Sequence, residues 1–251
     1  MIRRKLLSGM YRIIDSLENN NNTNFHKNGE EALLVNFSKI KAQSSVIIFD
    51  VGANKGDWAD IIKSRIQNSE LHLFEPSFVA YKTLMKRYHC VNHMFISNVA
   101  CSDKNEILPL YYDKPGSTLA SLTKRDLIFY NINMEKTEDV QCIRLDDYID
   151  ENNIEHIDFI KVDVEGHELA VLKGLGDYLN PNFIDFVQFE YGGANIDSNI
   201  TLKNLFEIFN KSDFRIGKLY PKNIIFDEYV PRMENYQYSN WVAVSNSIEF
   251  K

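Results

Sequence analysis

Residues 45–59 read SVIIFDVGANKGDWA, and this stretch decides the fold class. Its first part, Ser45–Val51, is a continuous apolar run with the length of a strand that is buried on both faces. A turn containing glycine follows, and the residue spacing in Asp57–Ile66 predicts a helix. A buried strand that passes through a tight turn into a helix is the first part of a β-α-β unit, so we expect a parallel sheet.

The same alternation continues along the chain. Further strands are predicted at residues 71–74, 94–101, 107–112, 140–145, 158–164, 183–189, 214–219 and 241–244. Helical patterns lie among them at residues 78–88, 146–152, 167–175 and 201–210. We therefore expect one α/β domain, residues 43–251, in which helices cover both faces of a mostly parallel sheet.

Residues 1–42 are expected to form a helical extension to this domain. An amphipathic helix comes first, and its apolar positions are Leu6, Leu7, Met10, Ile13, Ile14 and Leu17. This helix is expected to pack on its own domain or on a partner chain, as in a homodimer. The alternative is weak contact with a membrane surface through the four basic residues Arg3, Arg4, Lys5 and Arg12. Asn19–Asn24 predicts a loop too polar to be ordered by burial, before a second helix at residues 29–41.

The composition excludes several classes of protein. A chain of 251 residues with 44% hydrophobic residues can bury a large core without disulfides. Its 28 basic and 35 acidic residues give a net charge of −7, which argues against a nucleic-acid partner. Cys90, Cys101 and Cys142 are too few and scattered for a disulfide framework or a zinc site. No segment reaches the roughly 20 apolar residues of a membrane span. We expect a cytoplasmic protein without a transmembrane segment.

Acidic residues follow the predicted strands at their carboxyl ends. The set is Asp50, Glu75, Asp103 with its neighbour Ser102, Asp163 with Glu165, and Glu190. In an open α/β sheet, ligands bind outside the carboxyl ends of the strands. This edge of the sheet is therefore the predicted active site.

The first turn distinguishes between nucleotide cofactors. A dinucleotide site uses G-x-G-x-x-G, whose backbone amides hold a pyrophosphate, whereas here the spacing is Gly52-x-x-x-Gly56. Asp50 would repel a pyrophosphate but attract an amino group or a sulfonium. Glu75 suits two ribose hydroxyls. These features favour S-adenosylmethionine over NAD.

The segments FDVGANKGDWA, LFEPS, NVACSD, LDDYI and FIKVDVEGHELAVLKG occur in this order along the chain. Together they resemble the FkbM family of S-adenosylmethionine-dependent methyltransferases, over roughly residues 44–244 and most specifically at Ile160–Gly174. The resemblance implies a Rossmann-like class I methyltransferase fold with a seven-stranded sheet. It also implies O-methylation of a hydroxyl on a sugar, a glycan or a glycosylated small molecule.

The resemblance assigns cofactor contacts residue by residue. Asp50, Gly52 and Asn54 would line the methionine end, together with Asp163 from the signature turn. Glu75 would hold the ribose, and Ser102 and Asp103 would lie beside the adenine.

The same signature turn carries the predicted catalytic residues, Asp163, Glu165 and His167, beside the transferring methyl group. His167 is the only histidine near a predicted strand end on this edge, and its pKa range suits a general base. The alternative is a structural or substrate-positioning role. For Glu165 the alternative is a cap of the following helix, stabilised by the helix dipole.

Metal-assisted transfer is a competing mechanism. Asp163 and Glu190 end adjacent predicted strands, which resembles the Mg²⁺ site of catechol-type O-methyltransferases. Such an ion would lower the pKa of the acceptor hydroxyl. The alternative is that Asp163 accepts hydrogen bonds from the cofactor or from loop amides, while Glu190 contacts the substrate.

Two segments are expected near the acceptor. Tyr111–Asp139 is interpreted as a lid with polar contacts from Ser117, Ser121, Lys124 and Arg125. Tyr191, Gly192 and Gly193 would offer an aromatic platform for a sugar ring. Two other functions stay open at this point: a catalytically silent binding module, and an NAD-dependent enzyme that modifies sugars.

Overall fold

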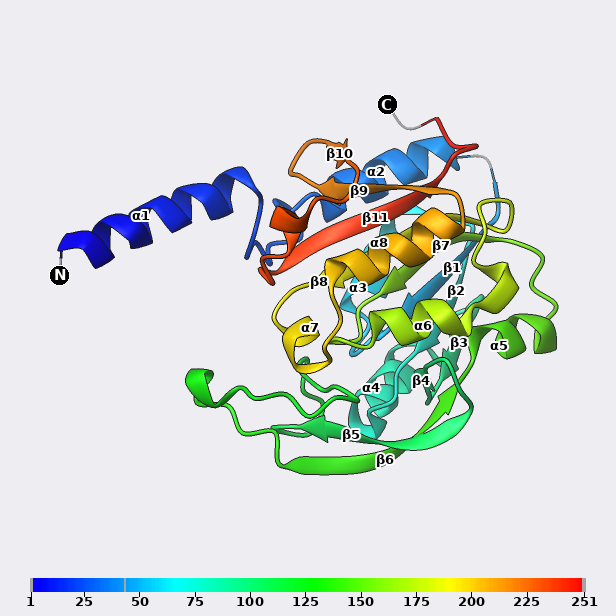
Figure 1. Ribbon diagram of the computed structural model, residues 1–251. Helices are drawn as coiled ribbons and strands as arrows, with labels where there is room; N and C mark the ends of the chain where they lie inside the picture. Colours follow the sequence, from blue (N-terminus) through cyan, green and yellow to red (C-terminus); the bar gives the residue numbers. More distant parts are fainter. Residues whose placement is uncertain (1, 43, 250–251) are drawn as a thin grey trace.

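Eight strands form the main sheet in the computed structural model, which describes residues 2–42 and 44–249 (Figure 1). Their order is β10-β9-β11-β8-β7-β1-β2-β3. The bounds are β1 Val46–Val51, β2 Ser69–Phe74, β3 Met94–Ser97, β7 Ile157–Val162, β8 Ile184–Tyr191, β9 Phe214–Leu219, β10 Ile224–Phe226 and β11 Ser239–Ser245. Strands β3, β2, β1, β7 and β8 are parallel, and β11 is antiparallel to both β8 and β9. The predicted α/β class with a mostly parallel sheet is confirmed.

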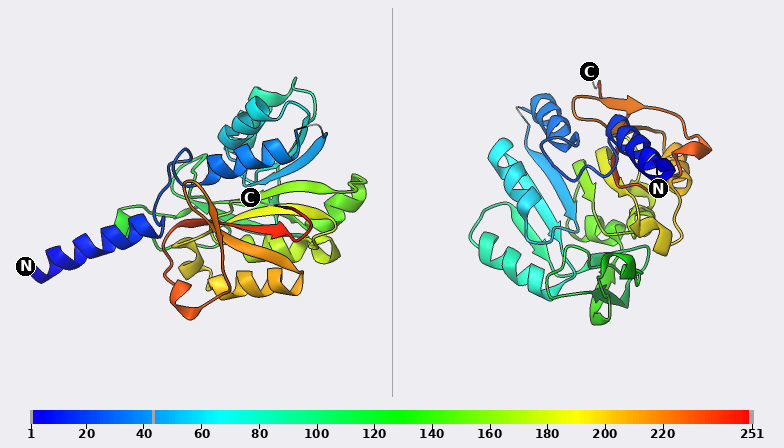
Figure 2. Two further views of the ribbon diagram at one scale, coloured as in Figure 1. Left: turned by 90° about the horizontal axis from the view of Figure 1, so that it is seen from above. Right: turned by 90° about the vertical axis from the view of Figure 1, so that its left-hand side faces the viewer.

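Helices cover both faces of this sheet, as predicted (Figure 2). One layer contains α2 (Glu30–Ile40), α3 (Asp57–Arg65) and α4 (Phe78–Tyr88), and the other contains α5 (Leu145–Glu151), α6 (Glu168–Gly174) and α8 (Leu202–Lys211). Because successive strand residues point to opposite faces, Ile48 packs with the first layer and Phe49 with the second. The strands therefore carry apolar residues on both faces, which explains the largely apolar runs in the sequence.

Two features of the strands differ from the prediction. The main sheet has one strand more than the expected seven, because the short run β10 pairs antiparallel with β9 at the edge. The third predicted strand is divided into β3 and β4 (Ala100–Cys101). Strand β4 belongs to a second sheet of order β4-β6-β5, with β5 at Glu106–Tyr112 and β6 at Lys136–Ile143. A local apolar pattern does not show where a chain leaves one sheet for another.

Helix α1 (Ile2–Leu17) projects away from the sheet domain (Figures 1 and 2). The asparagines after it form the expected loop, and side-chain hydrogen bonds connect this loop to the domain. The amide of Asn19 donates to the carbonyl oxygens of Asn28 (2.8 Å) and Leu219 (2.9 Å). Lys218 donates to Oδ1 of Asn20 over 2.6 Å. Hydrogen bonds, rather than apolar contacts, hold the loop against the domain.

Helix α2 packs on the sheet through Leu33, Leu34 and Phe37, which are fully buried. The ring of Phe37 contacts Phe159 on β7 and Phe186 on β8, with centroid distances of 5.2 and 5.5 Å. The predicted division of the chain at residue 42 stays a prediction.

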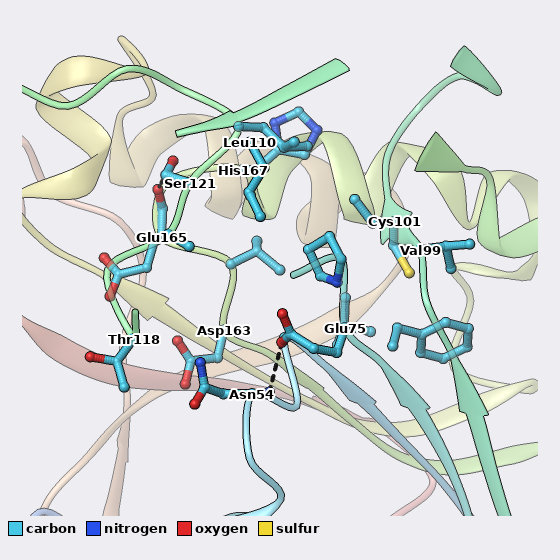
Figure 3. A pocket seen from close by; sticks show the side chains of 18 of the residues that line it. Asn54, Glu75, Val99, Cys101, Leu110, Thr118, Ser121, Asp163, Glu165 and His167 are labelled. Atoms are coloured by element: carbon cyan, nitrogen blue, oxygen red, sulfur yellow. Dashed lines mark hydrogen bonds between the residues drawn. The ribbon is translucent and has the colours of Figure 1, made fainter. Parts of the chain in front are cut away.

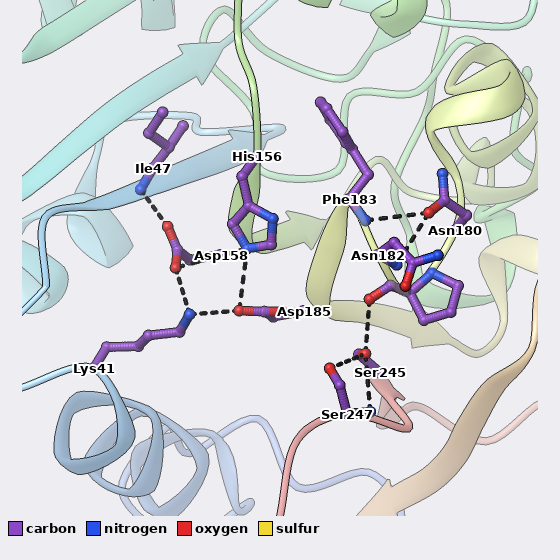
Figure 4. Close-up of polar contacts among 11 residues, drawn as sticks. Lys41, Ile47, His156, Asp158, Asn180, Asn182, Phe183, Asp185, Ser245 and Ser247 are labelled. Atoms are coloured by element: carbon purple, nitrogen blue, oxygen red, sulfur yellow. Dashed lines mark hydrogen bonds and ion pairs between the residues drawn. The ribbon is translucent and has the colours of Figure 1, made fainter.

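Lys41, just after α2, joins this helix to the ends of β7 and β8 that lie opposite the predicted site (Figure 4). Its Nζ atom lies 2.7 Å from Oδ1 of Asp158 and 2.5 Å from Oδ2 of Asp185. His156 Nε2 lies 3.2 Å from the same Asp185 oxygen, and Asp158 also accepts from the backbone N–H of Ile47. Histidine and the two aspartates are spaced like metal ligands, but the Lys41 ammonium supplies the cation.

We predict that Lys41→Met lowers the free energy of unfolding by about 3 kcal/mol, because two nearly buried carboxylates lose their partner. Urea denaturation of the full chain measures this loss. The matched control is Lys39→Met on the exposed face of the same helix, for which we expect a change within about 0.5 kcal/mol. Equal stability of the two variants would contradict the assigned role of Lys41.

Candidate active site

Two cavities lie at the carboxyl ends of β1, β2, β7 and β8, and they share Glu165 in their linings. The first encloses about 140 Å³ and is lined by residues of the first two predicted strand ends and of the signature turn. The second encloses about 850 Å³ and extends along the end of β8. The predicted location of the site therefore agrees with the cavities of the structure.

Glu75 is the central polar residue of the first cavity (Figure 3). Oε2 accepts from the backbone N–H of Asn54 and Oε1 from that of Ser77, both over 2.8 Å. Burial raises the pKa of Glu75 to about 7, although these two hydrogen bonds oppose the shift. Each carboxylate oxygen keeps acceptor capacity, so Glu75 can still bind a pair of ligand hydroxyls.

The opposite part of the first cavity is apolar. Val99, Leu110 and Leu122 line it, together with the thiol-bearing Cys101 (Figure 3). Ser102 and Asp103, predicted at this end, follow Cys101 but are not among its lining residues in the described part of the chain. An apolar slot next to a carboxylate is suited to a flat ring joined to a sugar.

The first turn brings β1 and β7 into close contact at Gly52. Its φ is +91°, and a Cβ atom there would lie 1.9 Å from the carbonyl oxygen of Asp163. Glycine is therefore required by both the conformation and the space. Asp50, two residues earlier, is 1% exposed, and neither of its carboxylate oxygens has a hydrogen-bond partner among the described residues. Burial raises the pKa of Asp50 to about 6, and Lys161 opposes this shift.

Lys161 is a buried cation on β7 that sequence analysis did not identify. It pairs in register with Asp50 on β1, and its Nζ atom lies 2.5 Å from Oδ2 of Asp163. Burial alone would lower the pKa of Lys161, but the charges of Asp163, Asp50, Glu30 and Glu190 hold it well above its usual range. The ammonium thus interacts with both carboxylates that were predicted to bind Mg²⁺. In the sequence, the feature that could have identified Lys161 is a lysine within an otherwise largely apolar predicted strand.

Glu165 separates the two cavities and comes from the turn after β7. It adopts a φ of +53°, and its carboxylate pairs with the guanidinium of Arg125. Burial raises the pKa of Glu165 to about 7, whereas Arg125 lowers it. The alternative role as a helix cap is wrong, because α6 starts only at Glu168 and has no side-chain cap.

The predicted lid segment lies over this turn. Ser121 donates from Oγ to the carbonyl oxygen of Glu165 over 2.8 Å, and Arg125 supplies the ion pair. The carbonyl oxygen of Ser117 accepts from the Asn54 amide over 3.3 Å. This segment therefore contributes lining residues to both cavities.

His167 lines the first cavity. Its Nε2 atom is 2.9 Å from Oγ of Ser102, and burial lowers the pKa of the ring below its usual value. His167 does not line the second cavity in the part of the chain that the structure describes. Its role as general base stays a prediction, and the geometry gives Glu165 the better position.

The second cavity combines carboxylates with tyrosines. Tyr238 donates to Oε1 of Glu190 over 2.8 Å, and burial raises the pKa of Glu190 well above its usual value. Glu168 accepts from the amide of Asn195 over 3.1 Å, and burial raises its pKa to about 7. Aromatic surface comes from Tyr191, Tyr236 and Tyr238, beside the two glycines that were predicted to form a platform with Tyr191.

We predict that Arg125→Gln raises the pKa of Glu165 above about 7, because the favourable charge beside the carboxylate is removed. Side-chain carboxyl ¹³C NMR between pH 5 and 9 measures the titration. Lys124→Gln, on the exposed neighbouring residue, should leave the pKa unchanged. A pKa that falls or does not move in Arg125→Gln would contradict this pairing.

The chain is similar to known methyltransferases. The family model described as the methyltransferase FkbM domain matches residues 50–216. The chain is 31% identical to "Methyltransferase sdnD" from Sordaria araneosa over 53% of this chain and 62% of that protein. It is 24% identical to "2-O-methyltransferase NoeI" from Sinorhizobium fredii over 71% of this chain and 76% of that protein. The chain spans 58% and 62% of the first two curated relatives.

Among solved structures, the plantazolicin methyltransferase BpumL in complex with SAH aligns with a TM-score of 0.47 at 9% identity, over 87% of this chain and 83% of that chain. The match over residues 50–216 shows that the chain belongs to the FkbM methyltransferase family, as the sequence motifs predicted. The mostly parallel α/β sheet described above is in keeping with membership of this family. None of the helices in the described ranges has the length and apolar character that crossing a membrane requires.

Proposed function

We propose that this protein is an S-adenosylmethionine-dependent O-methyltransferase whose acceptor is a neutral sugar, glycan or glycosylated small molecule. The observation that carries the proposal is the pair of cavities that meet at Glu165. A donor in one cavity and an acceptor in the other would meet beside a carboxylate. Alignment of two bound reactants supplies most of the rate enhancement in such a displacement.

The first cavity fits the proposed cofactor. Glu75 is positioned for ribose hydroxyls, and the slot beside Val99 and Leu110 for the adenine. Asp163 lines the same cavity and suits an amino group, whereas Asp50, predicted to contact the cofactor, is 1% exposed and is not among the described lining residues. When bound, S-adenosylmethionine supplies an electrophilic methyl group.

The second cavity favours a neutral acceptor. Its lining includes Glu165, Glu168 and Glu190, and Arg125 is already paired with Glu165. Among the described lining residues, this pairing leaves no free cation to bind an anionic ligand. Tyr236 and Tyr238 line the cavity with aromatic surface, which suits a sugar ring, whereas Tyr191 is 1% exposed and donates its hydroxyl to Glu234. The name of the relative NoeI, a 2-O-methyltransferase, supports oxygen as the acceptor atom.

Glu165 is the proposed general base. Its pKa of about 7 lies close to the operating pH, where a base is most effective. The acceptor hydroxyl would transfer its proton to the Glu165 carboxylate as the oxygen attacks. Glu190 is engaged by the hydroxyl of Tyr238, so its proposed role is to position the acceptor.

The proposed reaction does not use Mg²⁺. The Lys161 ammonium lies at hydrogen-bonding distance from Asp163 and interacts with Glu190, so a cation already balances both carboxylates. A second, divalent cation at the same oxygens would be repelled. A cytoplasmic location is also part of the proposal, supported by the unpaired thiols of Cys90, Cys101 and Cys142.

We predict that Glu75→Gln weakens binding of S-adenosylhomocysteine about 10- to 100-fold, because a charge-assisted hydrogen bond to the ribose is lost. Isothermal titration calorimetry of the full chain measures the affinity. Glu228→Gln, on an exposed loop, is the control and should bind as tightly as the unmodified protein. If a well-folded protein with Glu75 intact does not bind, the proposed cofactor is incorrect.

We predict that Glu165→Gln lowers kcat about 10²- to 10⁴-fold, because the variant cannot accept the proton. In the unmodified protein the rate should rise with pH and level off above about 7, since the base must be ionised. Transfer of a labelled methyl group to a panel of p-nitrophenyl glycosides measures the rate. The control variant is Glu168→Gln, which removes a different carboxyl group from the lining of the same cavity. An unchanged pH profile in Glu165→Gln would assign the base elsewhere, with His167 as the next residue to test.

A further inference from the structure

Helix α1 presents an apolar stripe that nothing covers. Leu6, Met10, Ile13 and Leu17 are 65%, 52%, 62% and 73% exposed, and helical spacing places them on one face. An isolated helix of this length is marginal in water, and Gly9 in its centre weakens it further. The helix therefore needs a surface on which to lie. The expectation that it packs on its own domain is not met among the described residues.

A second apolar element projects from the same side of the molecule. The short helix η1 (Ile128–Tyr130), within the lid segment, has Ile128, Phe129 and Tyr130 exposed by 71%, 88% and 75%. In Figure 1 and in the left view of Figure 2, α1 and η1 extend in the same direction. Phe129 and Tyr130 also line the second cavity, as do Asn21 and Thr23 in the loop after α1.

The charges of α1 indicate which kind of surface this helix binds. The helix carries Arg3, Arg4, Lys5 and Arg12 against one acidic residue, Asp15, in a protein whose net charge is −7. Basic residues beside an apolar stripe bind anionic lipid headgroups while the stripe enters the interface. Aromatic side chains such as Phe129 and Tyr130 also favour this interface.

We propose that α1 and η1 together seat this protein on an anionic lipid bilayer, with α1 lying in the plane of the headgroups. A second copy of the chain that paired through α1 would leave η1 exposed, whereas a bilayer accommodates both elements. With the protein seated in this way, the second cavity opens beside the lipid headgroups. This inference does not depend on the proposed methyl transfer.

Sedimentation of the full chain with vesicles tests the proposal. We expect tight binding to vesicles of phosphatidylcholine and phosphatidylglycerol at 3:1, and much weaker binding to phosphatidylcholine alone. The triple variant Arg3→Gln, Arg4→Gln, Lys5→Gln should bind the anionic vesicles on the order of 100-fold less tightly. High salt should likewise weaken binding of the unmodified protein to the anionic vesicles.

Variants of the two apolar elements separate the alternatives. Ile13→Glu on α1 should abolish binding, and Phe129→Ser on η1 should weaken it severalfold, while Ile107→Glu, exposed by 66% on β5, should bind normally. All three positions are on the surface, so circular dichroism should show unchanged folding. Equal binding by the unmodified protein and Ile13→Glu would overturn the proposal. A dimer in light scattering that becomes monomeric in Ile13→Glu, without vesicle binding, would assign α1 to a second copy instead.

Discussion

The buried ammonium of Lys161 is the interaction on which the site depends. Strands β1 and β7 bring the fully buried Asp50 and the half-buried Asp163 to the same edge of the sheet. Unpaired carboxylates there would be costly or would take up protons. Lys161 lies 2.5 Å from Asp163 and is also attracted by Asp50 and Glu190. One cation next to the carboxyl end of β7 thus allows several acidic strand ends to meet.

The two cavities follow from this arrangement. Two residues after Asp163, Glu165 adopts a φ of +53° and lines both cavities. Arg125 from the lid segment then pairs with it and moderates its pKa. The two cavities therefore share a carboxyl group whose pKa of about 7 lies near neutral pH.

Sequence patterns predicted the layers of the fold and the edge of the sheet that carries the site, because periodicity and acids at strand ends are local signals. They did not predict the division of residues 94–101 between two sheets, the strand β10 or the partners of Lys161. Each of these depends on contacts between segments far apart in the chain. The role of Glu165 also depends on a distant contact. The helix that follows it suggested a cap, but its carboxylate pairs with Arg125, 40 residues away. The order of the asparagine loop depends likewise on distant Leu219 and Lys218.

The most direct test of this account is an NMR titration of the lysine side-chain amines, with the Lys161 signal assigned from Lys161→Arg. We predict that Lys161 keeps its proton at pH 10.5, the reference value for a lysine, because the surrounding carboxylates hold its pKa well above its usual range. A Lys161 amine that loses its proton together with the exposed lysines, or at lower pH, would contradict the account. The carboxylates at the strand ends would then need another partner, and a metal ion would return as the leading candidate.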